Sequence, residues 1–128
     1  VGNPPFIGKL KMREDLGDGY VEALRKAYPS IPDSADFVMY WWHKAAQSVQ
    51  QRGQSGKSGA WRFGLITTRA AKQTFNVRVI QAYTVDPKHP VSIVFAVPDH
   101  PWVDTLFAAK VRIAISVVAQ LLEVHYRG

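Results

Sequence analysis

The sequence has 128 residues, of which 47% are hydrophobic and 12% aromatic, and its 16 basic and 10 acidic side chains give a formal net charge of +6. One globular domain over residues 1–128 is therefore expected, and the positive charge suits a polyanionic partner such as nucleic acid. Cysteine is absent, which excludes a disulfide framework and a thiolate nucleophile and is compatible with a cytoplasmic location, and no apolar run is long enough to span a membrane.

The chain opens with Asn3-Pro4-Pro5-Phe6, which we call the clamp segment. Each proline fixes its own φ and pushes the residue before it into extended geometry, so the segment is stiff. The side-chain oxygen of Asn3 and the carbonyl of Pro4 are two acceptors that suit the two N–H donors of an exocyclic amino group. The ring of Phe6 can stack on the base that carries this group. The alternative interpretation is an ordinary turn, because Asn and Pro both favour turns.

The position of the clamp segment in the chain also carries a prediction. Ligand sites in open α/β sheets lie at the carboxyl ends of strands, so a strand is expected just before such a segment. The sequence starts at Val1, almost at the segment itself. We therefore expect a fragment of a larger domain.

Two helices are predicted in the first half of the chain. A short basic run that ends at Arg13 precedes Asp18, which is expected to cap a helix over residues 19–28. Ser34 is expected to cap a second helix, which Gly53 then ends.

This second helix is predicted from a stripe of apolar side chains at helical spacing. The stripe is expected to face the core, and its members are Val38, Trp41, Trp42, Ala45, Ala46 and Val49. His43 and Lys44 lie off the stripe, and we expect both to be solvated.

A strand is predicted after a polar, glycine-rich loop over residues 51–59. Aromatic and aliphatic side chains alternate with others over residues 60–67, which is typical of a strand that is buried on one face. Thr67 and Thr68 are then expected at the carboxyl edge of this strand.

The second half of the chain predicts one more helix and two more strands. A helix over residues 72–83 follows the first strand and implies a crossover to a parallel neighbour. The apolar run at residues 91–97 predicts a strand that is covered on both faces and ended by Pro98. The last strand, at residues 111–119, is expected to pair in the antiparallel direction.

Four stretches resemble, together with the clamp segment, the S-adenosylmethionine-dependent adenine-N6 DNA methyltransferases, in particular the methylase domains of large bacterial restriction-modification proteins. These stretches are residues 35–42, 62–68, 73–76 and 94–104. The resemblance implies the C-terminal half of a catalytic domain, with an α/β, partial Rossmann-like methyltransferase fold. Its mixed sheet would be mostly parallel with flanking helices and an antiparallel last strand. The likeness weakens after Ala119, and Arg69 stands where the family has an Asn after two threonines.

The resemblance also implies a function for the intact enzyme. A methyl group would pass from S-adenosylmethionine to the N6 amino group of an adenine flipped out of double-stranded DNA. The catalytic residues would be Asn3, Pro4, Pro5 and Phe6. Asn3 would also contact the cofactor, and the amine would attack the methyl group directly without a nucleophilic side chain. Further candidates for substrate binding are Phe6, Thr67, Thr68 and Arg69.

The cofactor-binding features of the family are not found in this sequence. Family members use a glycine-rich turn and an acidic residue upstream of the catalytic motif, whereas the cluster at Gly17 and Gly19 does not follow a predicted strand. We therefore expect this chain to bind S-adenosylmethionine weakly or not at all and to be inactive alone. The four histidines lack metal-ligand spacing, so no metal is expected.

Two other classes of function stay open from the sequence. The same clamp serves RNA adenines and protein glutamines, and the chain could instead be a non-catalytic module that binds nucleic acid or a protein. A partial domain of this kind would leave one edge of its sheet unpaired, and exposed edges recruit other strands. We therefore expect a homodimer through the strand at residues 60–67 or its neighbours.

Overall fold

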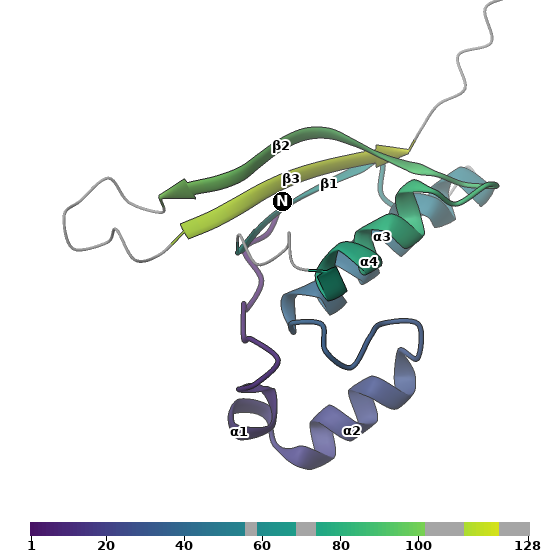
Figure 1. Cartoon of the computed structure of the whole chain (residues 1–128). Helices are drawn as coiled ribbons and strands as arrows, with labels where there is room; N and C mark the ends of the chain where they lie inside the picture. The colour runs from purple at the N-terminus through teal and green to yellow at the C-terminus, as the bar shows by residue number, and fades with distance from the viewer. Residues whose placement is uncertain (56–58, 69–73, 102–111, 121–128) are drawn as a thin grey trace, which may run out of the picture.

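The computed structural model describes residues 1–55, 59–68, 74–101 and 112–120, which form an α/β arrangement of helices and strands. Its elements in chain order are α1 (Met12–Leu16), α2 (Asp18–Ala27), α3 (Val38–Ser55), β1 (Arg62–Thr68), α4 (Thr74–Thr84), β2 (Val91–Pro101) and β3 (Arg112–Gln120). Figure 1 shows α3 and α4 together on one side of the sheet, with α1 and α2 beyond them. Within the described ranges, no helix is long and apolar enough to cross a membrane.

The described strands form one sheet in the order β1-β3-β2, and β3 is antiparallel to both of its neighbours. The antiparallel last strand is therefore confirmed, whereas the expectation of a mostly parallel sheet is wrong for these strands. β1 and β2 do run in the same direction, but β3 lies between them and takes the hydrogen bonds of both. Among the described residues, parallel pairing is present at Gly2, opposite Leu65.

Strand β2 differs from its prediction in both length and burial. It continues to Pro101, and a shift of its register on β3 takes Pro98 out of the ladder, where a proline has no N–H to donate. The side chains of Ile93, Val94 and Phe95 are 41%, 52% and 57% exposed. The described residues therefore do not cover this strand on both faces, because it lies at an edge of the sheet.

The core lies between the sheet and the helix pair α3 and α4. The indole of Trp42 is 1% exposed and meets Phe63 of β1 edge-on, with ring centroids 5.4 Å apart. Its Nε1 donates to the hydroxyl of Ser116 on β3 at 3.3 Å. Truncating a buried aromatic of this size to alanine costs about 3–5 kcal/mol, so this contact is a main attachment of α3 to the sheet.

The buried surface of helix α3 differs from its predicted apolar stripe. Trp41 belongs to the stripe but is 48% exposed, and His43 is 8% exposed although its position predicts contact with solvent. The reason is that α3 is covered on two sides. His43 lies between Tyr28, which follows α2, and Tyr83 of α4, with ring centroids 5.5 and 5.4 Å away. Trp41 instead lines an open pocket between α2 and α3.

The first helical region begins earlier than expected. Helix α1 is not predicted, yet its Met12 is fully buried. Gly17 has a φ of 85° and is the N-cap of α2, with no side-chain cap bond. The expected cap at Asp18 is therefore wrong, because Asp18 lies inside the first turn, where its carboxylate accepts from Nη1 of Arg13 at 3.1 Å.

Helix α3 starts at Val38, later than a cap at Ser34 predicts, and continues through Gly53 to Ser55. Two backbone N–H groups just before α3, those of residues 36 and 37, donate to Asn76 and Ile7 instead of to a Ser34 hydroxyl. The predicted bounds of β1, α4 and β3 are confirmed to within two residues.

Candidate active site

The clamp segment begins where the chain leaves the sheet. Gly2 donates to the carbonyl of Gly64 at 2.9 Å and its own carbonyl accepts from the N–H of Ile66 at 3.0 Å, which forms the parallel bridge opposite Leu65. Because the N-terminal segment and β1 run in the same direction, Asn3 follows the bridge toward the carboxyl end of β1. Figure 1 shows the purple N-terminal segment beside β1 before it turns away toward α1. In open α/β sheets, ligands bind at the edge formed by the carboxyl ends of the strands.

The four residues of the clamp segment differ in exposure. Asn3 and Pro5 are exposed, Pro4 is buried, and Phe6 is half-buried with its ring packed against the core. The backbone between them is stiffened by two consecutive prolines. The amide of Asn3 is therefore exposed next to the buried Pro4 and the ring of Phe6, which hold the backbone against the core.

The predicted substrate residues on β1 lie at the end of the same strand. Thr67 is 2% exposed, and its hydroxyl oxygen is 3.5 Å from the carbonyl oxygen of Ala114 on β3, which is long for a hydrogen bond. Thr68 is the last residue of β1, and its side chain and all of Arg69 lie outside the described residues. The structure thus brings Thr67 to the same end of the sheet as the clamp segment, with its hydroxyl turned toward β3.

After the clamp segment, the backbone is held by two residues that precede α3. Oδ1 of Asp36 accepts from the backbone N–H of Lys9 at 2.9 Å, and the N–H of Phe37 donates to the carbonyl of Ile7 at 3.0 Å. Asp36 is in turn bonded to Asn76, which is 2% exposed on α4. The clamp segment is therefore fixed at both ends, by β1 before it and by the start of α3 after it.

Reasoning from the sequence singles out neither Asp36 nor Asn76. A signal was available, because both residues lie within stretches that resemble the methyltransferase family, residues 35–42 and 73–76. A short polar side chain beside apolar neighbours in such a stretch is a candidate for a buried hydrogen bond.

A second buried polar pair lies behind the site, between α3 and α4. The hydroxyl of Tyr83 and Nδ1 of His43 are 2.6 Å apart. Burial lowers the pKa of His43, and the charge of Lys44 lowers it further, whereas burial raises the pKa of Tyr83. His43 is therefore neutral near pH 7, and its Nδ1 and the protonated Tyr83 hydroxyl share a hydrogen bond. This pair joins the two helices and lies away from the clamp segment.

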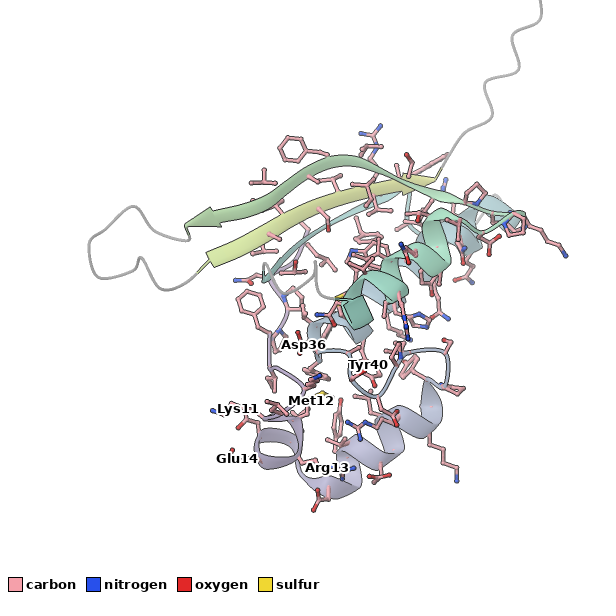
Figure 2. All side chains as sticks on the ribbon, viewed as in Figure 1. Lys11, Met12, Arg13, Glu14, Asp36 and Tyr40 are labelled. Carbon is pink, nitrogen blue, oxygen red and sulfur yellow. The ribbon has the colours of Figure 1, made fainter. Side chains whose placement is uncertain are left out.

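Basic side chains follow the clamp segment. Lys9 and Lys11 are exposed, and Figure 2 shows Lys11 extending outward beside the start of α1. Arg13 is instead paired with two carboxylates, and its hydrogen bonds to Glu22 and Asp18 raise its pKa. In the part of the chain that the structure describes, no group of three acidic or histidine side chains is placed to hold a metal ion.

Comparison with known families covers almost the entire chain. Residues 1–125 match the family described as the DNA-methyltransferase domain of MmeI. The chain belongs to this MmeI methyltransferase-domain family. The resemblance to the methylase domains of restriction-modification proteins, expected from the sequence, is thereby confirmed.

The fold of this MmeI-type domain is similar to that of a solved restriction-modification enzyme. The structure of the Type IIL enzyme MmeI in complex with DNA superposes with a TM-score of 0.60 at 21% sequence identity. The match covers 92% of the present chain and 15% of the MmeI chain, so the domain corresponds to a small part of that protein's length. No match is found among curated proteins.

Proposed function

We propose that this MmeI-type domain holds the acceptor base of a DNA methyltransferase that methylates the N6 amino group of adenine with S-adenosylmethionine. The observation that carries the proposal is the exposed amide of Asn3, which directly follows the parallel bridge at Gly2. Family membership supports a DNA methyltransferase domain. The sequence of the clamp segment supports an amino group as the group that receives the methyl.

The chain's own part of the chemistry is to prepare the amine. The lone pair of an exocyclic amino group is shared with its ring, so the planar group is a weak nucleophile. Acceptance of its two N–H donors by Asn3 and by the carbonyl of Pro4 would hold the nitrogen and favour a pyramidal geometry. This geometry frees the lone pair for attack, and acceptors fixed before the reaction cost no reorganisation when it occurs.

The described residues do not offer a cradle for the cofactor. Such a cradle uses a glycine-rich turn between a strand and the helix that follows it. The described glycines with positive φ are Gly17, between two helices, and Gly59, where a Cβ would lie 2.2 Å from the carbonyl oxygen of Ser48. Neither follows a strand. S-adenosylmethionine supplies an electrophilic methyl group when bound, and the residues of this chain act on the amine that receives it.

Further features support DNA as the substrate and a Rossmann-like fold for the domain. The net charge of +6 and the exposed Lys9 and Lys11 beside the clamp segment suit a phosphate backbone. A stacked adenine must leave the duplex before its amino group is accessible, and Phe6 would then stack on the flipped base. We also assign the sheet to part of a Rossmann-like fold, because α4 crosses from β1 to a strand of the same direction.

Asn3→Ala tests this function. The variant loses one acceptor of the amino group, so methyl transfer should fall by at least ~100-fold, as for loss of one transition-state hydrogen-bonding group. DNA binding should hardly change. The assay measures transfer of labelled methyl groups to duplex DNA by the protein that carries this domain together with a cofactor-binding segment. Gln47→Ala is the control, since it removes an exposed amide on α3 and should leave the rate unchanged.

The product of the same assay identifies the acceptor. Digestion of the methylated DNA followed by mass spectrometry should give N6-methyladenine. Methylcytosine in the digest, or transfer of label to RNA or to a protein glutamine offered in place of the DNA, would replace adenine in the proposal. An unchanged rate for Asn3→Ala would leave the clamp segment as an ordinary turn.

A further inference from the structure

We propose that Asp36, together with Asn76, is a positioning residue that holds the clamp segment in its working geometry through the backbone of residues 7–9. The effect on methyl transfer rests on the function proposed above. The effect on the order of the segment rests on the hydrogen bonds alone.

The carboxylate of Asp36 uses both of its oxygens for this purpose. Oδ1 accepts from the backbone N–H of Lys9 at 2.9 Å, and Oδ2 accepts from Nδ2 of Asn76 at 2.9 Å. The backbone N–H of Asp36 donates to Oδ1 of Asn76 at 3.0 Å, so the two side chains are bonded reciprocally. Figure 2 shows Asp36 between the N-terminal segment and the start of α3.

The position of these bonds determines what they hold. The bond from Phe37 to the carbonyl of Ile7 and the bond from Lys9 to Asp36 lie on either side of Gly8, just after the clamp segment. At the other end, both backbone groups of Gly2 are bonded to β1. The intervening residues are therefore tied at each end and contain two prolines. Holding reacting groups in place before the reaction removes an entropic cost from the barrier.

Asn76 gives the arrangement its rigidity. It is 2% exposed on α4, so its amide cannot exchange its protein partners for water without opening the core. Through Asn76, the backbone after the clamp segment is bonded to the helix that crosses between β1 and β2. The residues on either side of the clamp segment are thus bonded to β1, to the connection before α3 and, through Asp36, to α4, and none of these provides the acceptors for the amine.

The chemistry of the pair predicts which substitutions break it. A carboxylate can accept both bonds, whereas the amide introduced by Asp36→Asn has one acceptor and one donor. That amide must lose either the bond to Lys9 or the bond to Asn76, because rotation of Asn76 would break its bond to the backbone N–H of residue 36. Asn76→Asp fails for the opposite reason, since it places two carboxylates against each other. Exchanging both residues restores a donor and an acceptor for each of these three bonds.

The test compares Asp36→Asn, Asn76→Asp and the double exchange, with Asp33→Asn as the control because Asp33 lies on the same connection with an exposed carboxylate. Amide hydrogen exchange at Lys9 and Phe37 measures the order of the backbone in this chain. Initial rates in the methyltransferase assay give kcat and the KM for S-adenosylmethionine.

Each single substitution should speed exchange at Lys9 by ~10-fold or more, because it either removes the bond from Lys9 or releases the side chain that accepts that bond. Each should also lower kcat by ~10-fold or more without changing the KM for the cofactor. The double exchange should restore both quantities, and the control should change neither.

Unchanged exchange at Lys9 in the single variants would overturn the proposal. Faster exchange with an unchanged kcat would overturn the catalytic consequence, provided that Asn3→Ala lowers the rate in the same assay. If kcat falls only in proportion to the loss of folded protein and does not recover in the double exchange, the pair stabilises the fold but does not position the clamp segment. If Asn3→Ala itself leaves methylation intact, the proposed function fails, whereas exchange at Lys9 still decides whether the pair orders the segment.

Discussion

Gly59 provides a sharp test of the connection between α3 and β1. Its φ is 95°, and a Cβ at this position would lie 2.2 Å from the carbonyl oxygen of Ser48 and 2.9 Å from the backbone nitrogen of Arg52. The next residue, Ala60, donates to the carbonyl and the hydroxyl of Ser48 at 3.1 and 3.0 Å. Gly59→Ala therefore adds a methyl group where the backbone of α3 already lies.

Gly17→Ala is the matched control. Gly17 has a similar φ of 85°, but no atom lies within 4 Å of the position of its added Cβ. At Gly17 the φ of 85° and ψ of 148° lie in a region that glycine adopts almost exclusively, which costs another residue about 1–3 kcal/mol, and this is the whole expected loss there. Gly59→Ala is strained at its own positive φ and in addition must displace backbone, which adds about 1–3 kcal/mol as in an overpacked core.

Urea unfolding of this chain, followed by far-ultraviolet circular dichroism, gives both free energies of unfolding. We expect Gly59→Ala to be the more destabilising of the two by the displacement cost. Equal losses in the two variants would show that the chain entering β1 does not pack against Ser48, and the start of β1 would then not be fixed by α3.

Two further predictions concern the base and the buried histidine. Phe6→Ala should weaken capture of the flipped adenine by about 1–3 kcal/mol of lost stacking, measured as a raised KM for DNA. Phe6→Tyr should keep most activity. An equal loss in both variants would show that Phe6 does not act by stacking on the base. The pKa of His43 is lowered on folding, so the unfolded chain takes up the proton first and the free energy of unfolding should fall as the pH drops below about 6.5, by at most about 1.4 kcal/mol per pH unit. Unfolding titrations should run from about one pH unit above to about 1.5 units below the ordinary histidine pKa of about 6.5. They should show a shallower slope for His43→Gln, and identical slopes would mean that the imidazole is not buried as neutral.

The sequence was a good guide to the positions of most elements, and it singled out the clamp segment. Two prolines in a row leave few conformations, so local chemistry alone predicts a stiff segment with two acceptors. The apolar period of α3 and the β-branched run of β3 are also local, and both elements are found near their predicted bounds. Before Asn3 the structure has an isolated parallel bridge at Gly2 and not the named strand that such a segment was expected to follow.

What the sequence could not predict depends on partners that are distant in the chain. The burial of His43 and the exposure of Trp41 follow from which helices cover α3, and a helical period does not contain that information. The bond between Asp36 and Asn76 joins residues 40 positions apart, so each local stretch can mark a candidate for a buried hydrogen bond but cannot identify its partner. The exposure of Phe95 in an apolar run likewise reflects the place of β2 at the edge of the sheet.

The place of β3 between β1 and β2 has a consequence for the order in which the chain can fold. β3 is the last of these strands in the sequence, yet it supplies the central partner for both of the others, and the pairing of Arg62 with Ala119 joins residues nearly half the chain apart. During synthesis, β1 and β2 therefore leave the ribosome before the strand that satisfies their backbone. Their edges stay open to other chains until β3 is made, and closure of such distant pairs is slow. The helices α1 and α2 contact each other and come early in the sequence, so they can form before β3 is made.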